Sequence, residues 1–266
     1  MCMKKLLKLL VKLFYRKKSL KYQDRLYAKI SNTKVDAIDI LDYRYSPDYT
    51  VELKSKHTLS FLPPIRNQKY LSSCASHMAM GMEEIQLGER RYIEGSELFH
   101  YYNARMYITQ DYPNNSGMTI RDACKTLKEF GFTPELAWPY LPEKFNTEPG
   151  LASYWLAGLH AVDRYERVES IRDIKYSLCV ENTSIGCGIF VDDKFSYLNK
   201  SNYLYANDKQ LGGGHAVIIV GYDDERGVLI FRNSWGEEFG NNGYFEMKYD
   251  AFIKASFDWW RIVLKP

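Results

Sequence analysis

The chain carries two kinds of hydrophobic pattern, one in each half. In the first half, apolar residues recur at i, i+4, i+8 and i+11, at Cys74, Met78, Met82 and Ile85. This spacing predicts a helix that Ser72 or Ser73 caps at its N-terminus. A second helix is expected from Gly95-Ser96-Glu97 onward. A third follows the capping-box-like Thr119–Asp122 and ends at Gly131.

In the second half the pattern changes to short apolar runs bounded by turn residues. Such runs predict strands, and they lie at 186–191, 215–221, 228–231 and 244–247. A helical half followed by a strand-rich half is typical of an α+β protein with two lobes. We place the helical lobe at about 74–150 and the β-rich lobe at about 158–266.

The first 47 residues differ from the rest and are interpreted as a basic leader with a linker. Residues 1–25 hold nine Lys and Arg side chains against one acidic residue, Asp24, and their leucines fall at helical spacing. The pattern predicts a basic amphipathic helix. A surface helix, attachment to an anionic membrane and a degenerate secretion signal all remain open. Docking on the rest of the chain as an autoinhibitory segment is the other hypothesis for this leader.

Composition narrows the function classes only slightly. The chain has 266 residues, 45% of them hydrophobic, which is enough for a sizeable core, and a net charge of +3 gives no argument for nucleic acid binding. Its five cysteines are odd in number and include no Cys-x-x-Cys pair. A disulfide scaffold and a zinc ribbon are therefore disfavoured, and no metal site is expected. Reduced thiols in the cytoplasm or another reducing compartment fit best, and secretion fits less well.

Cys74 stands where a helix N-terminus would favour a thiolate, the nucleophilic form of cysteine. Taken alone, it is more often a small buried core residue. A general base is therefore needed to support a catalytic interpretation. His77 lies one turn further along the predicted helix and is a competing base, but it would point along the helix rather than across a cleft.

His215 and Asn233 supply the other parts of a thiol-nucleophile site. The turn-like segment 223–227 lies between their strands, and the midpoint of 215 and 233 is 224. A hairpin would place the imidazole and the amide nearly side by side, so that Asn233 orients His215. The side-chain amide of Gln68 and the backbone N–H of Cys74 could both donate hydrogen bonds to the oxyanion that forms when the thiolate attacks a carbonyl. Trp235 could shield the Asn233–His215 contact from water.

Together these stretches resemble the papain-like cysteine peptidases. The matching blocks are 68–74, Gly214-His215-Ala216-Val217, Asn233-Ser234-Trp235-Gly236 and 240–244. The segments 62–68, 101–105, 120–123, 138–140 and 257–260 resemble the bacterial and viral branch. The resemblance covers roughly 48–266, which we take as the peptidase domain. It implies a helical lobe against an antiparallel β-barrel-like lobe, with the active site in the cleft between them.

The resemblance also assigns roles to individual residues. It implies that Cys74 is the nucleophile, His215 the base and acid, Asn233 the orienting residue and Gln68 the oxyanion donor, with no cofactor. Gly213, Gly214 and Ala216 would partly line a substrate pocket with room for a bulky apolar group, with Trp235 beside them. Leu71 replaces a cysteine of the family's first disulfide, and Ala75 replaces an aromatic residue. The first change agrees with a reducing compartment.

The sequence therefore predicts a thiol endopeptidase that acts on polypeptides through an acyl-enzyme. An amidase or transpeptidase with the same nucleophile, and a catalytically idle binding protein on this fold, are the alternatives.

Overall fold

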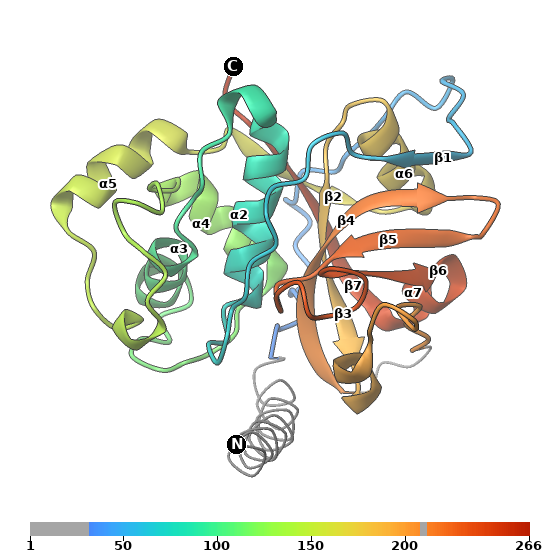
Figure 1. The fold of residues 1–266 in the computed structure, drawn as a ribbon. Helices are drawn as coiled ribbons and strands as arrows, with labels where there is room; N and C mark the ends of the chain where they lie inside the picture. The colour runs from blue at the N-terminus through green and yellow to red at the C-terminus, as the bar shows by residue number, and fades with distance from the viewer. Residues whose placement is uncertain (1–31, 208–211) are drawn as a thin grey trace, which may run out of the picture.

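The computed structural model describes residues 32–207 and 212–266, so the basic helix expected within residues 1–25 lies outside the described residues. Two lobes stand side by side (Figure 1). The helical lobe consists of α2 (Cys74–Leu87), α3 (Glu97–Asn103), α4 (Ile120–Phe130) and α5 (Leu151–Ala157). The second lobe is built on a sheet. The α+β class predicted from the two hydrophobic patterns is confirmed.

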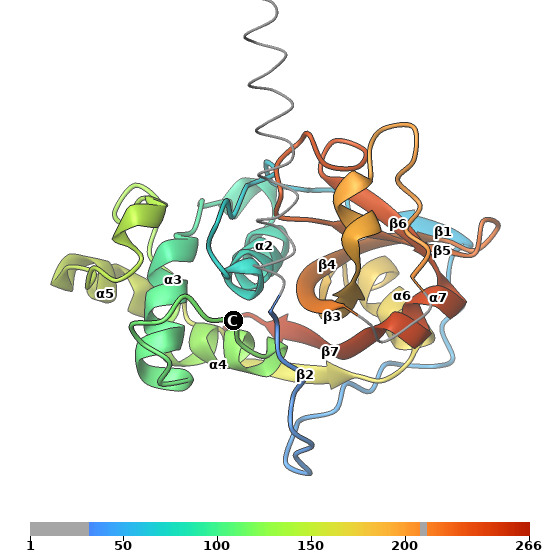
Figure 2. The ribbon, with the colours of Figure 1, turned by 90° about the horizontal axis from the view of Figure 1, so that it is seen from below.

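The sheet is antiparallel at every strand pair. Its strands are β1 (Lys56–Thr58), β2 (Arg164–Val168), β3 (Ile185–Val191), β4 (Gly213–Asp223), β5 (Val228–Arg232), β6 (Tyr244–Lys248) and β7 (Ser256–Val263). Their order is β2-β7-β3-β4-β5-β6, and β1 pairs with β4. Two helices, α6 (Ile171–Cys179) and α7 (Tyr249–Ala255), pack on this lobe (Figure 2). All four predicted strand runs lie inside β3, β4, β5 and β6.

Short helical turns connect these elements, at Glu89–Arg91, Ala104–Ile108, Pro142–Lys144, Gly158–His160 and Asp193–Tyr197. The three predicted helices are all present. The caps of α3 and α4 follow the sequence signals, since Ser96 accepts from the N–H of Phe99 at 3.1 Å and Thr119 from that of Asp122 at 3.0 Å. Gly131 ends α4 with φ +69°. Ser73 takes the N-cap position of α2 without a side-chain cap bond, so the expected capping there is wrong.

Helix α2 is the element that joins the two lobes. It is buried along most of its length, and the thioether side chains of Met78 and Met82 lie against strand β3. A Cβ at Gly186 of β3 would lie 2.5 Å from the sulfur of Met82, so glycine lets the strand approach the helix closely. Methionine fills such irregular space well. The packing holds the N-terminus of α2 against strand β4.

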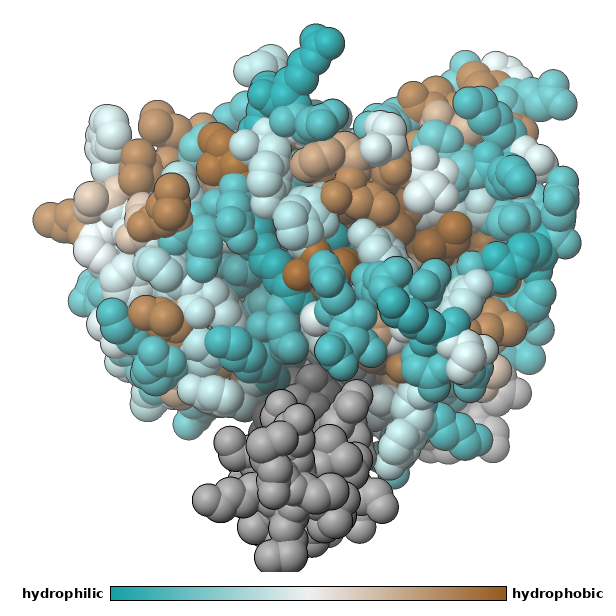
Figure 3. Space-filling view, in the orientation of Figure 1, coloured by the Kyte–Doolittle hydropathy of each residue, from teal (hydrophilic) through white to brown (hydrophobic). Residues whose placement is uncertain are grey.

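On the face seen in Figure 3, both lobes are mostly hydrophilic, with scattered apolar patches. Exposed apolar side chains include Leu151 and Trp155 on α5 and Leu136 in the preceding loop. Scattered exposure of this kind is normal for a globular protein and carries no functional argument. No helix within residues 32–207 and 212–266 is long and apolar enough to cross a membrane.

Candidate active site

Cys74 is the first residue of α2 and is completely buried. Its sulfur lies 3.0 Å from Oγ1 of Thr33, and the backbone N–H of Ala216 on β4 forms a hydrogen bond to it. Burial raises the pKa of the Cys74 thiol, while the hydrogen bonds from Thr33 and Ala216 act in the opposite direction. Cys74 therefore lies at the lobe interface, against the residue that follows His215, where burial favours the neutral thiol.

His215 and Asn233 are in direct contact. Nε2 of His215 lies 2.7 Å from Oδ1 of Asn233, and the N–H of Ser234 donates to the same oxygen at 2.8 Å. An amide oxygen can only accept, so Nε2 carries the proton and Nδ1 has the free lone pair. Among the described residues, Nδ1 of His215 has no hydrogen-bond partner. This tautomer is the one that a base acting through Nδ1 requires.

The contact forms across the predicted hairpin but in a different register. The ladder pairs Ile218 with Arg232, and the register shifts by one between Ile219 and Gly221. Continued outward, the ladder would place His215 opposite Trp235 rather than opposite Asn233. The side chains nevertheless meet, because β5 ends at Arg232 and Asn233 lies beyond the ladder.

Trp235 and Gln68 complete the buried surroundings of this pair. The indole ring of Trp235 lies 4.8 Å from the imidazole of His215, centroid to centroid. Oε1 of Gln68 accepts from Oγ of Ser234 at 2.7 Å and from Nε1 of Trp235 at 3.1 Å. These two bonds fix the amide orientation, and Nε2 of Gln68 donates one hydrogen to the carbonyl of Leu71 at 2.9 Å. The second hydrogen of Nε2 remains for another acceptor.

A segment upstream of the predicted domain lies across these residues. We call residues 32–36 the strap. Its backbone N–H at Thr33 donates to the carbonyl of Gly214 at 2.7 Å, and that at Lys34 donates to the carbonyl of Met118 at 3.2 Å. Seen from below, this blue segment enters between α2 and the sheet (Figure 2). The strap thus bridges both lobes and covers Cys74.

The far end of the strap is fixed by a group of contacts that we call the Asp36 clamp. The buried carboxylate of Asp36 accepts from Nε1 of Trp260 at 2.7 Å, from Nη2 of Arg167 at 3.2 Å and from the N–H of Arg121 at 3.2 Å. The N–H of Asp36 donates to Asp258 at 2.5 Å. A buried carboxylate with this many donors is well satisfied, so the clamp anchors the strap to the body of the protein.

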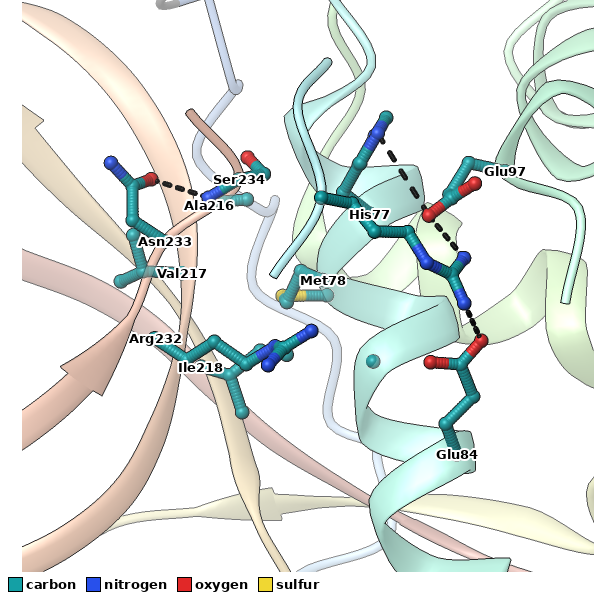
Figure 4. A pocket seen from close by; sticks show the side chains of 12 residues that line it. His77, Met78, Glu84, Glu97, Ala216, Val217, Ile218, Arg232, Asn233 and Ser234 are labelled. Atoms are coloured by element: carbon teal, nitrogen blue, oxygen red, sulfur yellow. Dashed lines mark hydrogen bonds and ion pairs between the residues drawn. The ribbon is translucent and has the colours of Figure 1, made fainter. Parts of the chain in front are cut away.

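A small cavity of about 20 Å³ lies behind the site, between the lobes, roughly the room of one water molecule (Figure 4). Glu84 and Glu97 line it from the helical lobe and both pair with Arg66. His77 also lines it, with Nδ1 3.0 Å from the carbonyl of Ser73 and Nε2 3.9 Å from Glu97. Both nitrogens of His77 are thus directed into the helical lobe. This arrangement disfavours His77 as the general base for Cys74.

The predicted substrate-binding glycines lie on the first residues of β4. Gly214 is buried beneath the strap, because a Cβ there would lie 2.0 Å from the carbonyl oxygen of Thr33. Gly213 pairs with Val191 at the strand end. The wall opposite is aromatic: a Cβ on Gly188 would lie 2.1 Å from the ring of Phe257, and that ring also approaches Gly214. Phe257 therefore limits the space that the glycines leave, and it was not foreseen.

Two further histidines, His100 and His160, have packing roles. His100 is buried and joins Ser76 of α2 to the carbonyl of Ala123 on α4, at 2.9 and 3.0 Å. His160 stacks on Phe132. The described cysteines Cys74, Cys124, Cys179 and Cys187 are all free thiols. No group of His, Cys, Asp and Glu side chains in the described ranges could hold a metal ion.

Comparison with known proteins agrees with this fold. The model of the papain family of cysteine proteases matches residues 50–256. An uncharacterized peptidase C1-like protein, L477, of Acanthamoeba polyphaga mimivirus is 31% identical over 213 residues, which cover 74% of this chain and 68% of that protein. A cathepsin L-like proteinase of Fasciola hepatica is 26% identical, and the match spans 57% of its length.

Among solved structures, xylellain, a cysteine protease from Xylella fastidiosa, superposes with a TM-score of 0.77 at 28% identity, covering 88% of this chain and 96% of that one. The two-lobed fold and these relatives define a cysteine peptidase, a hydrolase whose substrate class is polypeptide. The chain belongs to the papain family of cysteine proteases. The viral and bacterial relatives also agree with the branch to which the sequence motifs pointed.

Proposed function

We propose that this protein is a thiol endopeptidase with Cys74 as nucleophile and His215 as general base and acid. The observation that carries the proposal is the pair of bonds around Asn233, because they leave Nδ1 of His215 as the unprotonated nitrogen. Support also comes from the contact between the Cys74 thiol and the N–H of Ala216, next to His215. The base is thus oriented, but Nδ1 of His215 makes no hydrogen bond to the Cys74 sulfur in this structure, so the reaction requires the two groups to come within hydrogen-bond reach.

The reaction then proceeds in two stages. His215 takes the thiol proton through Nδ1, the thiolate of Cys74 attacks the peptide carbonyl, and the oxyanion is held by Nε2 of Gln68 and the N–H of Cys74. The imidazolium protonates the leaving amine, and the acyl group stays on sulfur as a thioester. Water, deprotonated by His215, attacks the thioester, releases the acid product and restores the thiol.

The test compares the full chain with its Cys74→Ala variant on a peptide library. We expect cleavage by the wild type and none by the variant, while an epoxide-type thiol probe labels the wild type at Cys74 alone. Cleavage by Cys74→Ala at the wild-type rate would overturn the assignment. Addition of an amine nucleophile distinguishes hydrolysis from transfer, because a transpeptidase would give the amide adduct as its main product.

We propose further that the form with the strap in place is latent. Thr33 lies within hydrogen-bond distance of the Cys74 sulfur, and the carbonyl of Gly214, to which an extended peptide could bond, is already taken by the strap. A substrate must therefore displace residues 32–36 before it can reach the thiol. This extends the hypothesis of an autoinhibitory leader from residues 1–25 to the segment that follows them.

Two further proposals concern the surroundings of the enzyme. The free thiols, and the fully buried Leu71 at the place of the family's disulfide cysteine, support a location in a reducing compartment.

The nine cationic side chains within residues 1–25 support binding to an anionic membrane. Equal sedimentation of the full chain and a chain lacking residues 1–25 with phosphatidylserine vesicles would contradict the membrane proposal.

A further inference from the structure

We propose that Tyr140 is a positioning residue that holds both oxyanion donors in place through one hydroxyl group. The inference rests on the proposed function, because those donors are the side chain of Gln68 and the N–H of Cys74. Tyr140 belongs to neither stretch of sequence around the site, and it contacts the structure on both sides of the nucleophile.

The hydroxyl of Tyr140 has two partners. It donates to the backbone carbonyl of Gln68 at 2.9 Å and lies 2.8 Å from Oγ of Ser73. The carbonyl of Gln68 can only accept, so the single proton of Tyr140 is committed to it and Ser73 must be the donor in the second bond. The donor and the acceptor in both hydrogen bonds are therefore fixed. Burial raises the pKa of Tyr140 well above its usual range, so the phenol stays protonated over the pH range of the activity assays.

Ser73 explains why the second bond affects catalysis. It precedes Cys74 and sits at the N-cap position of α2, yet it makes no cap bond because its hydroxyl is turned toward Tyr140. The carbonyl of Ser73 accepts from the backbone N–H and from Nδ1 of His77, each at 3.0 Å. The peptide unit between Ser73 and Cys74 is planar, so fixing its carbonyl fixes the direction of the Cys74 N–H.

The same hydroxyl fixes the other donor. The main chain of Gln68 is held by Tyr140 at its carbonyl and by Ser234 at its N–H, at 2.9 Å in each case. Its side chain is oriented by Ser234 and Trp235. The ring of His77 packs edge-on against Tyr140, with centroids 4.9 Å apart, and limits the movement of the phenol. Tyr140 thus links two donors that belong to different turns of the chain.

The test uses Tyr140→Phe in the full chain, which removes only the hydroxyl. We expect kcat to fall about tenfold with KM nearly unchanged, because a donor out of position weakens binding of the oxyanion and not of the ground state. Tyr222→Phe is the matched control. Tyr222 is also buried and donates to a backbone carbonyl, that of Lys54, at 2.8 Å, but on the β lobe.

Two inhibitors distinguish a positioning role of Tyr140 from a general loosening of the active site. A peptide aldehyde forms an oxyanion on Cys74, whereas the corresponding alcohol does not, and the strap affects both equally. We expect Tyr140→Phe to weaken the aldehyde about tenfold and leave the alcohol unchanged. Ser73→Ala should show the same selectivity. In the Gln68→Ala background, the effect of Tyr140→Phe should shrink, since one of the two positioned donors is gone.

The outcomes are distinguishable from failure of the proposed function. Loss of cleavage in Cys74→Ala establishes the thiol mechanism independently of Tyr140. If wild type cleaves, and Tyr140→Phe changes neither kcat nor the aldehyde-to-alcohol ratio, the positioning role is overturned. Equal weakening of aldehyde and alcohol, or an equal effect in Tyr222→Phe, would also overturn it by showing a merely structural contribution.

Discussion

The hydroxyl of Thr33 lies 3.0 Å from the sulfur of Cys74. The two residues are 41 positions apart, and the contact places a polar side chain of the leader on the proposed nucleophile. Thr33 is nearly as buried as Cys74 itself.

Removal of the strap should raise activity. A chain that begins at Asp36 retains the clamp but lacks Thr33, and we expect its kcat/KM on short peptides to exceed that of the full chain at least about tenfold, because the tethered competitor is gone. A chain that begins at Asn32 is the control and should behave like the full chain. Equal rates for the two truncated chains would rule out inhibition by the strap.

Cleavage of the exposed loop after the strap should have the same effect. Ile38, Ile40 and Leu41 are 99%, 88% and 81% exposed, while Asp36 and Asp42 on either side are held by Arg121 and Arg167. Exposed loop tips are preferred sites of proteolysis. Limited digestion with thermolysin should cut first within residues 37–41, and peptidase activity should rise in parallel. The Cys74→Ala variant should give the same first fragments without activity, and a first cut elsewhere would contradict the prediction.

The pH dependence of thiol reactivity should report the covered state. Burial raises the pKa of Cys74 and lowers the pKa of His215 to about 4, so at neutral pH both groups are uncharged and little thiolate is present. Alkylation by iodoacetamide should therefore be slow in the full chain at pH 7 and accelerate toward alkaline pH. The chain that begins at Asp36 should react faster, and its rate should begin to rise at a lower pH than that of the full chain. Identical profiles would argue against the strap as the cause.

Replacement of Phe257 should widen the substrate preference. Its ring lies on Gly188 and near Gly214, in the space that the small residues of the predicted pocket would otherwise leave open. We expect Phe257→Ala to raise kcat/KM about tenfold for peptides that place a bulky apolar residue in this pocket. An effect of this size is typical of added space in an apolar pocket. Kinetics with small residues at the same position should not change. A peptide-library profile checks both, and an unaltered preference would exclude Phe257 as a determinant.

Local signals explain how much of the fold could be predicted. The helical spacing from Cys74 gave the correct start of α2, and the turn-like segment 223–227 gave the hairpin that joins β4 and β5. The exact register could not be predicted, because one shift between Ile219 and Gly221 moves every later pair. Periodicity carries information about faces and turns, and it carries none about such local irregularities.

The remaining features depend on contacts between distant segments. Thr33 and Tyr140 lie 41 and 67 residues from their partners at the site, and neither stands in the stretches that carry the predicted catalytic residues. At Ser73 the local sequence signal is present, but a contact with a distant segment overrides it. Its type and position favour a cap, but a tertiary bond to Tyr140 competes for the hydroxyl. The extent of the leader and the domain boundary at residue 48 stay predictions, as do the roles of Cys74, His215, Asn233 and Gln68.

The strap is joined to the enzyme by the continuous chain through Asp36, and this gives its inhibition a particular concentration dependence. A tethered segment acts at an effective concentration on the order of millimolar, whatever the amount of protein present. Dilution alone will therefore not activate the enzyme, whereas a peptide substrate supplied at several millimolar can compete for the cleft. Cleavage after Asp36 would turn the strap into a separate ligand, and its inhibition would then weaken on dilution.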